Sequence, residues 1–220
     1  MELKHHQAGL SFEFRRYDMH ESGSREPGYR IRLLLNEAEG IGIRGGKVLS
    51  VACGNRNAAE ELVRSGRFEV DSLFLDTKSI IYLQGLENGK GSMPDLGSGK
   101  YDIVSVDHMF EYLNPDNKKT SMERLIDVLK GGGILSLTFP TSLPGNFIEE
   151  RLEYMERPVP LVHLFRDHAG EKAVRLEFES GIVDALRNAG WSVLKLIDYS
   201  SERNLVDVQE SFAVLRKPEQ

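Results

Sequence analysis

Short hydrophobic runs alternate with amphipathic segments along most of the chain. Six runs rich in β-branched or aromatic residues are bounded by turn residues, as strands are. They span 48–53, 70–75, 101–106, 133–139, 191–197 and 211–216. Between most of them, apolar residues recur at the three- and four-residue spacing of a helix face. This alternation predicts an α/β fold with a largely parallel sheet that is covered by helices on both faces.

Five groups of apolar residues mark the predicted helices. They are Leu33, Leu34 and Ala38; Ala58, Leu62 and Val63; Ile80, Ile81 and Leu83; Met122, Leu125, Ile126 and Leu129; and Ile182, Val183, Leu186 and Ala189. The fourth pattern stops at the glycines of LKGGG and the fifth at Gly190, and glycine is a common residue at the end of a helix.

Three segments interrupt the alternation. Residues 85–100 are rich in Gly, Ser, Asn and Pro and predict a loop around at most one short strand. Ligands of α/β sheets bind beyond the carboxyl ends of the strands, so we expect residues 140–175 to be a substrate-side insertion over the pocket. Residues 1–27 are expected to form an N-terminal lid or arm, or simply an ordered or frayed terminus.

Composition limits the class of protein. With 220 residues, of which 40% are hydrophobic, the chain is expected to form a single domain over 1–220. It has no apolar run of the roughly 18–20 residues that a membrane helix needs, and its start lacks the apolar core of a secretory signal. We therefore expect a cytoplasmic protein, and the single cysteine, Cys53, fits a reducing compartment. The net charge of −6 disfavours nucleic acid as a partner, although a local basic patch would still fit the composition.

Several motifs follow one another in a recognisable order. VLSVACGNR at 48–56 is a strand that enters a small-residue turn, Asp76 ends the next strand, YDIVSVDHMFEYL covers 101–113, and MERLIDVLKGGGILSLTFP covers 122–140. With the closing LRNAGW and SFAVLRK segments, they resemble the motifs of class I S-adenosylmethionine-dependent methyltransferases, of the small-molecule type that includes quinone-biosynthesis methyltransferases. The resemblance covers about residues 28–217. It implies a Rossmann-like, seven-stranded, mostly parallel sheet with an antiparallel last strand.

The resemblance also implies a reaction and a binding site. The reaction is transfer of a methyl group from S-adenosylmethionine to an O, N or C atom of a small-molecule acceptor, with S-adenosylhomocysteine as product. By resemblance, Gly54 and its neighbours Ala52, Cys53 and Asn55 hold the aminoacyl end of the cofactor, Asp76 the ribose, and Ser92 with Met93 the adenine, while Thr77 and Asp107 complete the cofactor-binding set.

Physical arguments support parts of this assignment. Small residues in a turn let backbone amides approach a ligand closely. A carboxylate can accept hydrogen bonds from both ribose hydroxyls, and Asp76 follows Gly54 by 22 residues, close to the roughly 20 expected for that role. Asp76 could equally cap a helix that begins at Thr77, and the two roles are compatible.

The first motif departs from the family pattern at three positions. Ser50 stands where the family has an acidic residue, Ala52 replaces the first turn glycine and Arg56 the last. Arg56 could pair with the cofactor's carboxylate, point outward from the helix, or block the pocket. These departures keep two alternatives open: a non-catalytic binding or regulatory protein with this fold, and a methyltransferase that acts on RNA or protein.

Candidate catalytic residues are few. His108, with Asp107, ends a strand at the expected mouth of the pocket, where it could contact cofactor or substrate or be an exposed turn residue. His163, in the 140–175 insertion, and Tyr17, near the N-terminus, could serve as substrate-side bases or be ordinary surface residues. No metal site is predicted, since His5 and His6 have no third ligand at suitable spacing. Cys53 is read as a small buried residue, not a nucleophile.

Overall fold

A computed structural model describes residues 2–7, 10–17, 28–53, 57–75, 96–110, 115–143, 174–175, 177–203 and 206–219, and all structural statements here concern those residues. The helices are α1 (Tyr29–Gly40), α2 (Asn57–Arg64), α4 (Pro115–Val128) and α7 (Glu177–Asn188). The strands are β1 (Glu2–Gln7), β2 (Leu10–Tyr17), β3 (Gly46–Cys53), β4 (Phe68–Leu75), β5 (Tyr101–Asp107), β6 (Leu129–Leu143), β7 (Val174–Arg175), β8 (Ser192–Arg203) and β9 (Val206–Arg216).

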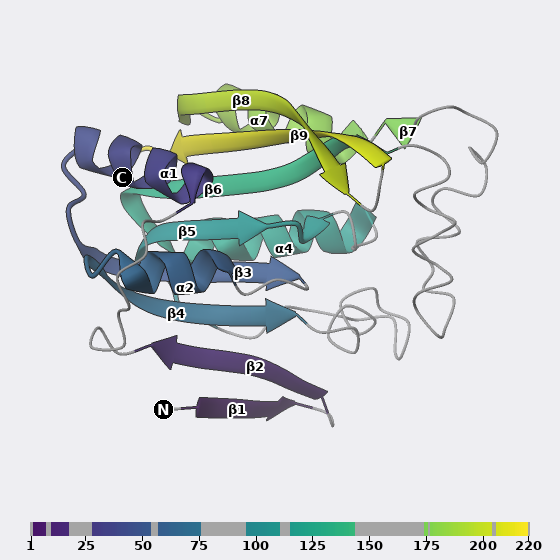
Figure 1. Cartoon of the computed structure of the whole chain (residues 1–220). Coiled ribbons are helices and arrows are strands. Elements are labelled where there is room, and N and C mark those ends of the chain that lie inside the picture. Colours follow the sequence, from purple (N-terminus) through teal and green to yellow (C-terminus); the bar gives the residue numbers. More distant parts are fainter. Residues whose placement is uncertain are drawn as a thin grey trace.

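The strands form one sheet in the order β1-β2-β4-β3-β5-β6-β9-β8, with β7 paired to β6 (Figure 1). The four central strands β4, β3, β5 and β6 are parallel. The last strand, β9, lies antiparallel between β6 and β8. The predicted Rossmann-like fold with an antiparallel last strand is therefore confirmed. Five of the six predicted strand segments lie within a strand, and the segment 191–197 begins one residue before β8.

The predicted count of seven strands is wrong, because the described residues contain nine. Residues 2–17 form the hairpin β1-β2, whose second strand pairs antiparallel with β4 and extends the sheet beyond it. The two-residue strand β7 pairs with the end of β6. Residues 2–7 and 10–17, which belong to the expected N-terminal arm, therefore extend the sheet. In the expected 140–175 insertion, Ser142 and Leu143 of β6 pair with the two residues of β7.

Helices cover both faces of the sheet, as predicted (Figure 1). One face packs against α1 and α2, where Val48, Ile103 and Ile134 project from successive strands into a cluster with Leu34 and other apolar residues. The opposite face carries the neighbouring strand residues, which pack with apolar side chains of α4 and α7. Side chains alternate between the faces of a strand, so each strand contributes to both cores.

Four of the five predicted helices are present, and the one around Ile80 to Leu83 lies outside the described residues. Two of the predicted boundaries are wrong: α4 ends at Val128, so Leu129 and the following glycines belong to β6, and Ala189 lies just beyond the end of α7. The helix α7 ends before Gly190, whose φ of 86° is the left-handed conformation that glycine adopts without strain. None of the described helices has both the length and the hydropathy needed to cross a membrane.

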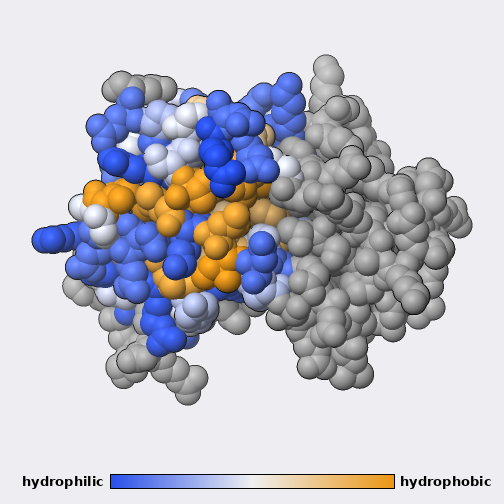
Figure 2. Space-filling view, turned by 90° about the horizontal axis from the view of Figure 1, so that it is seen from above, coloured by the Kyte–Doolittle hydropathy of each residue, from blue (hydrophilic) through white to orange (hydrophobic). Residues whose placement is uncertain are grey.

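The strand β8 forms the outer edge of the sheet beyond β9. Its apolar residues Val193, Leu194 and Ile197 are half-buried, and Leu196 is exposed. Figure 2, viewed from above, shows apolar surface gathered in a band among hydrophilic residues.

Candidate functional site

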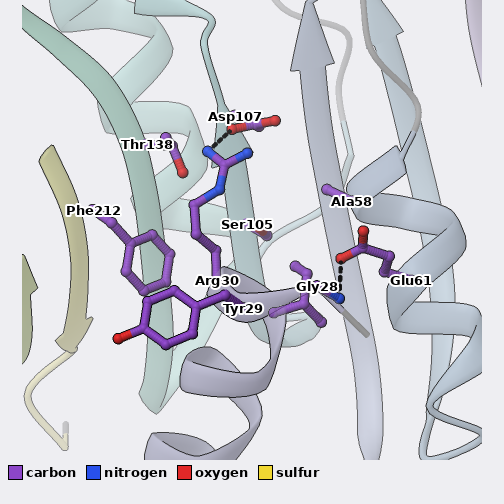
Figure 3. Close-up of a pocket in the computed structure, with 10 residues that line it drawn as sticks. Gly28, Tyr29, Arg30, Ala58, Glu61, Ser105, Asp107, Thr138 and Phe212 are labelled. Carbon is purple, nitrogen blue, oxygen red and sulfur yellow. Dashed lines mark hydrogen bonds and ion pairs between the residues drawn. The ribbon is translucent and has the colours of Figure 1, made fainter. Parts of the chain in front are cut away.

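A pocket of about 170 Å³ lies on the α1 and α2 face of the sheet, toward the carboxyl ends of β5 and β6 (Figure 3). Its lining comes from the start of α1, from α2 and from three adjacent strands: Gly28, Tyr29, Arg30, Ile31, Ala58, Glu61, Ser105, Asp107, Thr138 and Phe212. In open α/β sheets this edge is where ligands bind.

A partly buried ion pair crosses the pocket. Arg30, in the first turn of α1, reaches over the sheet so that its Nη1 lies 3.0 Å from Oδ1 of Asp107, the last residue of β5 (Figure 3). The Asp107 side chain is 11% exposed and that of Arg30 is 38% exposed. Burial alone would lower the pKa of Arg30, but Asp107, Tyr199 and Glu210 together raise it above its ordinary value. Arg30 is therefore a permanent cation at the pocket.

Rows of hydroxyl side chains run across the face of the sheet that carries the pocket. Ser72, Ser50, Ser105 and Ser136 are aligned across four parallel strands and are all buried. The next residues on the same face form a second row in which Ala52, Asp107 and Thr138 are aligned. Ser105 and Thr138 line the pocket although each is only 6% exposed. The Ser50 hydroxyl has no hydrogen-bond partner within the described part of the chain.

The N-terminus of α1 also borders the pocket. Gly28 offers no side-chain cap to this helix. Instead its N–H donates to Oε2 of Glu61 on α2, at 3.0 Å, and a Cβ at Gly28 would lie 2.9 Å from that carboxylate. Glycine therefore permits the close approach that joins α1 to α2. The partial positive charge of the helix N-terminus adds to that of Arg30.

His108 follows Asp107 in an unusual backbone conformation. Its φ is 51°, the one positive φ of a non-glycine residue in the described ranges, and its N–H donates to the carbonyl oxygen of Thr138 at 3.0 Å. The ring is buried, and Nε2 lies 3.7 Å from both Oδ1 of Asp107 and Oε1 of Glu210. The alternative of an exposed turn histidine is therefore wrong, because the left-handed backbone turns the ring into the protein.

Glu210 and Tyr199 extend this charged cluster onto the last two strands. Glu210 on β9 is 2% exposed, and Tyr199 on β8 is its partner in the strand register. Burial raises the pKa of the Tyr199 phenol, and the carboxylates of Glu210 and Asp107 raise it further, against the lowering effect of Arg30. The phenol therefore stays protonated at neutral pH.

The structure brings together some of the residues predicted from the sequence. Ala52, 4% exposed, lies beside Asp107 in the strand register, and His108 directly follows Asp107 in the chain. Cys53 ends β3. The backbone of Tyr17 pairs with Val70 near the amino end of β4, away from the pocket edge of the sheet. The remaining predicted residues lie outside the described part of the chain: Gly54, Asn55, Arg56, Asp76, Thr77, Ser92, Met93 and His163.

Sequence reasoning missed several pocket residues. Arg30 looked like an ordinary charge in a helical pattern, and nothing local distinguishes it. A sequence pattern could have identified Ser105 and Thr138. Polar residues recur at every second position in otherwise apolar strands, as in Ser105 with Asp107 and Ser136 with Thr138. Such a polar stripe on one face predicts a site instead of core packing. Within the described ranges, no three His, Cys, Asp or Glu side chains form a group that could hold a metal ion.

Comparisons with known proteins find structures with a similar fold but no matching sequence family. No family model matches the sequence, and no curated protein matches it. Among solved structures, a 1,6-didemethyltoxoflavin-N1-methyltransferase from Burkholderia thailandensis, solved with 1,6-didemethyltoxoflavin and S-adenosylhomocysteine, is 16% identical with a TM-score of 0.51. The match covers 86% of this chain and 77% of that chain.

A second solved structure, described for the conversion of a disulfide bond into a thioacetal group during echinomycin biosynthesis, is 19% identical with a TM-score of 0.50. That match covers 93% of this chain and 85% of the other. At such identities the likeness concerns the fold. The chain has the Rossmann-like fold of the class I S-adenosylmethionine-dependent methyltransferases.

Proposed function

We propose that this protein transfers a methyl group from S-adenosylmethionine to an O, N or C atom of a small-molecule acceptor. The observation that carries the proposal is the Arg30–Asp107 pair, which presents a cation and an anion at the carboxyl edge of the sheet. The aminoacyl end of S-adenosylmethionine is a zwitterion, so it matches both charges. Arg30 would bind its carboxylate and Asp107 its ammonium group.

The other pocket groups fit the same ligand. The hydroxyls of Ser105 and Thr138 can donate to a carboxylate or accept from an ammonium group, and both residues are more than nine-tenths buried while lining the pocket. The N-terminus of α1 favours a negative group beside it. Hydroxyls facing a buried pocket need hydrogen-bond partners, and a polar ligand end would provide them.

The residues predicted from the resemblance complete the proposed site. Gly54 and its neighbours would contact the cofactor where β3 leads toward α2, Asp76 would accept hydrogen bonds from the ribose, and Ser92 with Met93 would flank the adenine. Ala52 supports this arrangement because its small side chain, beside Asp107, leaves room at the edge of the sheet.

S-adenosylmethionine supplies a methyl group on a sulfonium sulfur, which is already a good leaving group. The protein's own task is to hold the acceptor in line, exclude water and match the charges at the site. Among the compared structures, the Burkholderia enzyme was solved with a small molecule and S-adenosylhomocysteine, which supports a small-molecule acceptor here.

Thermal unfolding with added ligands tests this function. S-adenosylhomocysteine at 100 times its dissociation constant should add about 2.7 kcal/mol of stability. Adenosine, which lacks the amino-acid end, should stabilise the protein far less if Arg30 and Asp107 bind that end. Asp76→Ala should weaken binding of both ligands. No stabilisation at millimolar S-adenosylhomocysteine would refute the proposal, and binding without methyl transfer to any acceptor would favour the non-catalytic alternative.

A further inference from the structure

Two aromatic residues line the pocket from one side. Tyr29, the first residue of α1, is 63% exposed, and Phe212 on β9 is 2% exposed. In Figure 3 both rings lie on one side of the Arg30 side chain, and Glu61 lies on the other. Among the described residues, Leu196 on β8 is the one other large apolar residue that is exposed. A single exposed aromatic residue is ordinary on a protein surface, but Tyr29 borders a pocket at the ligand-binding edge of the sheet.

The backbone that carries Tyr29 is held on both sides. Before it, the N–H of Gly28 donates to Oε2 of Glu61 at 3.0 Å. After it, Arg30 forms the ion pair across the pocket, and Ile31 is 6% exposed within the apolar core. The position of the ring is thus largely fixed before a ligand binds, and a tyrosine side chain has only two χ angles. A ligand that stacks on this ring therefore loses little affinity to the ordering of the protein.

The strand register separates the aromatic side of the pocket from the charged side. Asp107, Thr138 and Phe212 are aligned on the adjacent strands β5, β6 and β9, and Ile197 on β8 continues the row. The row passes from a carboxylate through a hydroxyl to two apolar side chains. Neighbouring strands lie about 4.8 Å apart, so the backbone of Phe212 is roughly 10 Å from that of Asp107. This spacing suits two different ligand groups, one charged and one apolar.

The proposed orientation of the cofactor directs it away from the aromatic side. Its aminoacyl end is proposed to bind Asp107 on β5, and its ribose and adenine are proposed to lie toward β4, on the far side of β3. The strand β9, which carries Phe212, lies in the opposite direction from β5, beyond β6. The aromatic side is therefore left for the other molecule that methyl transfer requires, the acceptor.

We propose that Tyr29 and Phe212 bind the methyl acceptor and that the acceptor carries a planar conjugated ring, an inference that rests on the proposed function. The acceptor ring stacks on Tyr29, and Phe212 adds apolar contact from the sheet. Offset-stacked and edge-to-face aromatic pairs contribute affinity beyond the apolar area that they bury. A saturated ring of similar size buries a similar area but does not stack. Tyr29 is therefore a residue that selects acceptors for planarity.

The first experiment compares naphthalene-2,3-diol with its saturated counterpart, decahydronaphthalene-2,3-diol. Dissociation constants are measured by ligand-observed NMR in the presence of S-adenosylhomocysteine at a concentration that saturates each variant. The aromatic diol should bind wild type about 3–10-fold more tightly than the saturated diol. Tyr29→Leu, which keeps apolar bulk and removes the ring, should weaken binding of the aromatic diol by about 3–10-fold and change that of the saturated diol by less than about twofold.

Two control variants accompany this comparison. Tyr29→Phe keeps the ring, so its affinity for the aromatic diol should stay within about twofold of wild type. Leu196→Ser removes the other exposed apolar side chain. Leu196 is aligned with Ala213, which belongs to the core on the opposite face of the sheet, so this variant should bind both diols as wild type does.

The second experiment locates the bound ring. In protein with isotope-labelled tyrosine, the ring signals of Tyr29 are identified by their loss in Tyr29→Leu. Stacked naphthalene-2,3-diol should shift these signals through its ring current, whereas the saturated diol, which has no ring current, should leave them nearly in place.

The outcomes separate this inference from the proposed function. If wild-type protein does not bind S-adenosylhomocysteine, the proposed function fails. If it does bind, the assignment of the acceptor site is overturned by equal affinity for the two diols, by no binding of naphthalene-2,3-diol at millimolar concentration, or by Tyr29→Leu that binds this diol as wild type does. It is also overturned if Tyr29→Leu weakens binding of S-adenosylhomocysteine as much as binding of the diol, because Tyr29 would then contact the cofactor.

Discussion

Breaking the Arg30–Asp107 ion pair, which is partly buried, should lower the free energy of unfolding by more than breaking an exposed ion pair does. At the observed 3.0 Å, two unit charges attract by about 5 kcal/mol at an effective dielectric constant near 20. Desolvation of Asp107 opposes this attraction, and the 38% exposure of the Arg30 side chain screens it further. A net coupling of about 1–3 kcal/mol remains, as for other hydrogen bonds between charged groups.

A double-mutant cycle measures this coupling directly. The variants are Arg30→Met, Asp107→Asn and the double variant, each unfolded in urea at pH 7. Arg30→Met alone should cost more than the coupling energy, because it leaves Asp107 and Glu210 buried without their common cation.

The matched control is the Arg64–Glu60 pair on the surface of α2, where the same charge types lie 3.3 Å apart and both side chains are at least 35% exposed. Its coupling should be about 0.5 kcal/mol or less. A coupling between Arg30 and Asp107 no larger than that of the control would refute the reasoning.

Three further changes test other parts of the structure. Gly46→Ala should destabilise the fold by about 2–4 kcal/mol in urea, because φ is +124° and the new Cβ would lie 2.2 Å from Oδ2 of Asp102; Gly42→Ala, at φ +89° with open space around it, should cost only about 1–2 kcal/mol. Lys217→Met should cost about 1.5–3 kcal/mol, since Nζ donates to the carbonyl oxygens of Ile126 in α4 and Leu129 at the start of β6, both at 2.8 Å, and an unchanged urea midpoint would contradict that role. Burial raises the pKa of Tyr199, so above pH 10 the unfolded chain loses a proton that the folded chain keeps; stability should fall as pH rises from 10, and Tyr199→Phe should flatten that fall.

The sequence predicted the fold well because hydrophobic periodicity is a local property that the fold uses directly. The apolar face of Met122, Leu125 and Ile126 lies within α4, and the apolar runs at 48–53 and 101–106 became the central strands β3 and β5. The hairpin β1-β2 was missed although Leu10, Phe12 and Phe14 alternate with polar residues. Residues 1–27 were expected to form only a lid, an arm or a terminus, and the strand β4 that pairs with β2 is far away in the sequence.

The site was predicted only in part, because its geometry depends on register between strands. Asp107 and His108 could be placed at the pocket mouth, since they end a predicted strand. That Glu210 faces His108 follows from the antiparallel pairing of β9 with β6, which no local pattern encodes. Arg30 reaches Asp107 across 77 positions of sequence, and only the packing of α1 on the sheet brings them together.

Calorimetric titration with S-adenosylhomocysteine, comparing wild type with Arg30→Met and the control Arg64→Met, tests the central claim most directly. The account predicts saturable binding at one site in wild type, a loss of about 10–100-fold in affinity for Arg30→Met, and an affinity within about twofold of wild type for Arg64→Met. Binding that Arg30→Met leaves unchanged, or no binding to wild type at millimolar ligand, would contradict the claim that this pocket holds the aminoacyl end of the cofactor.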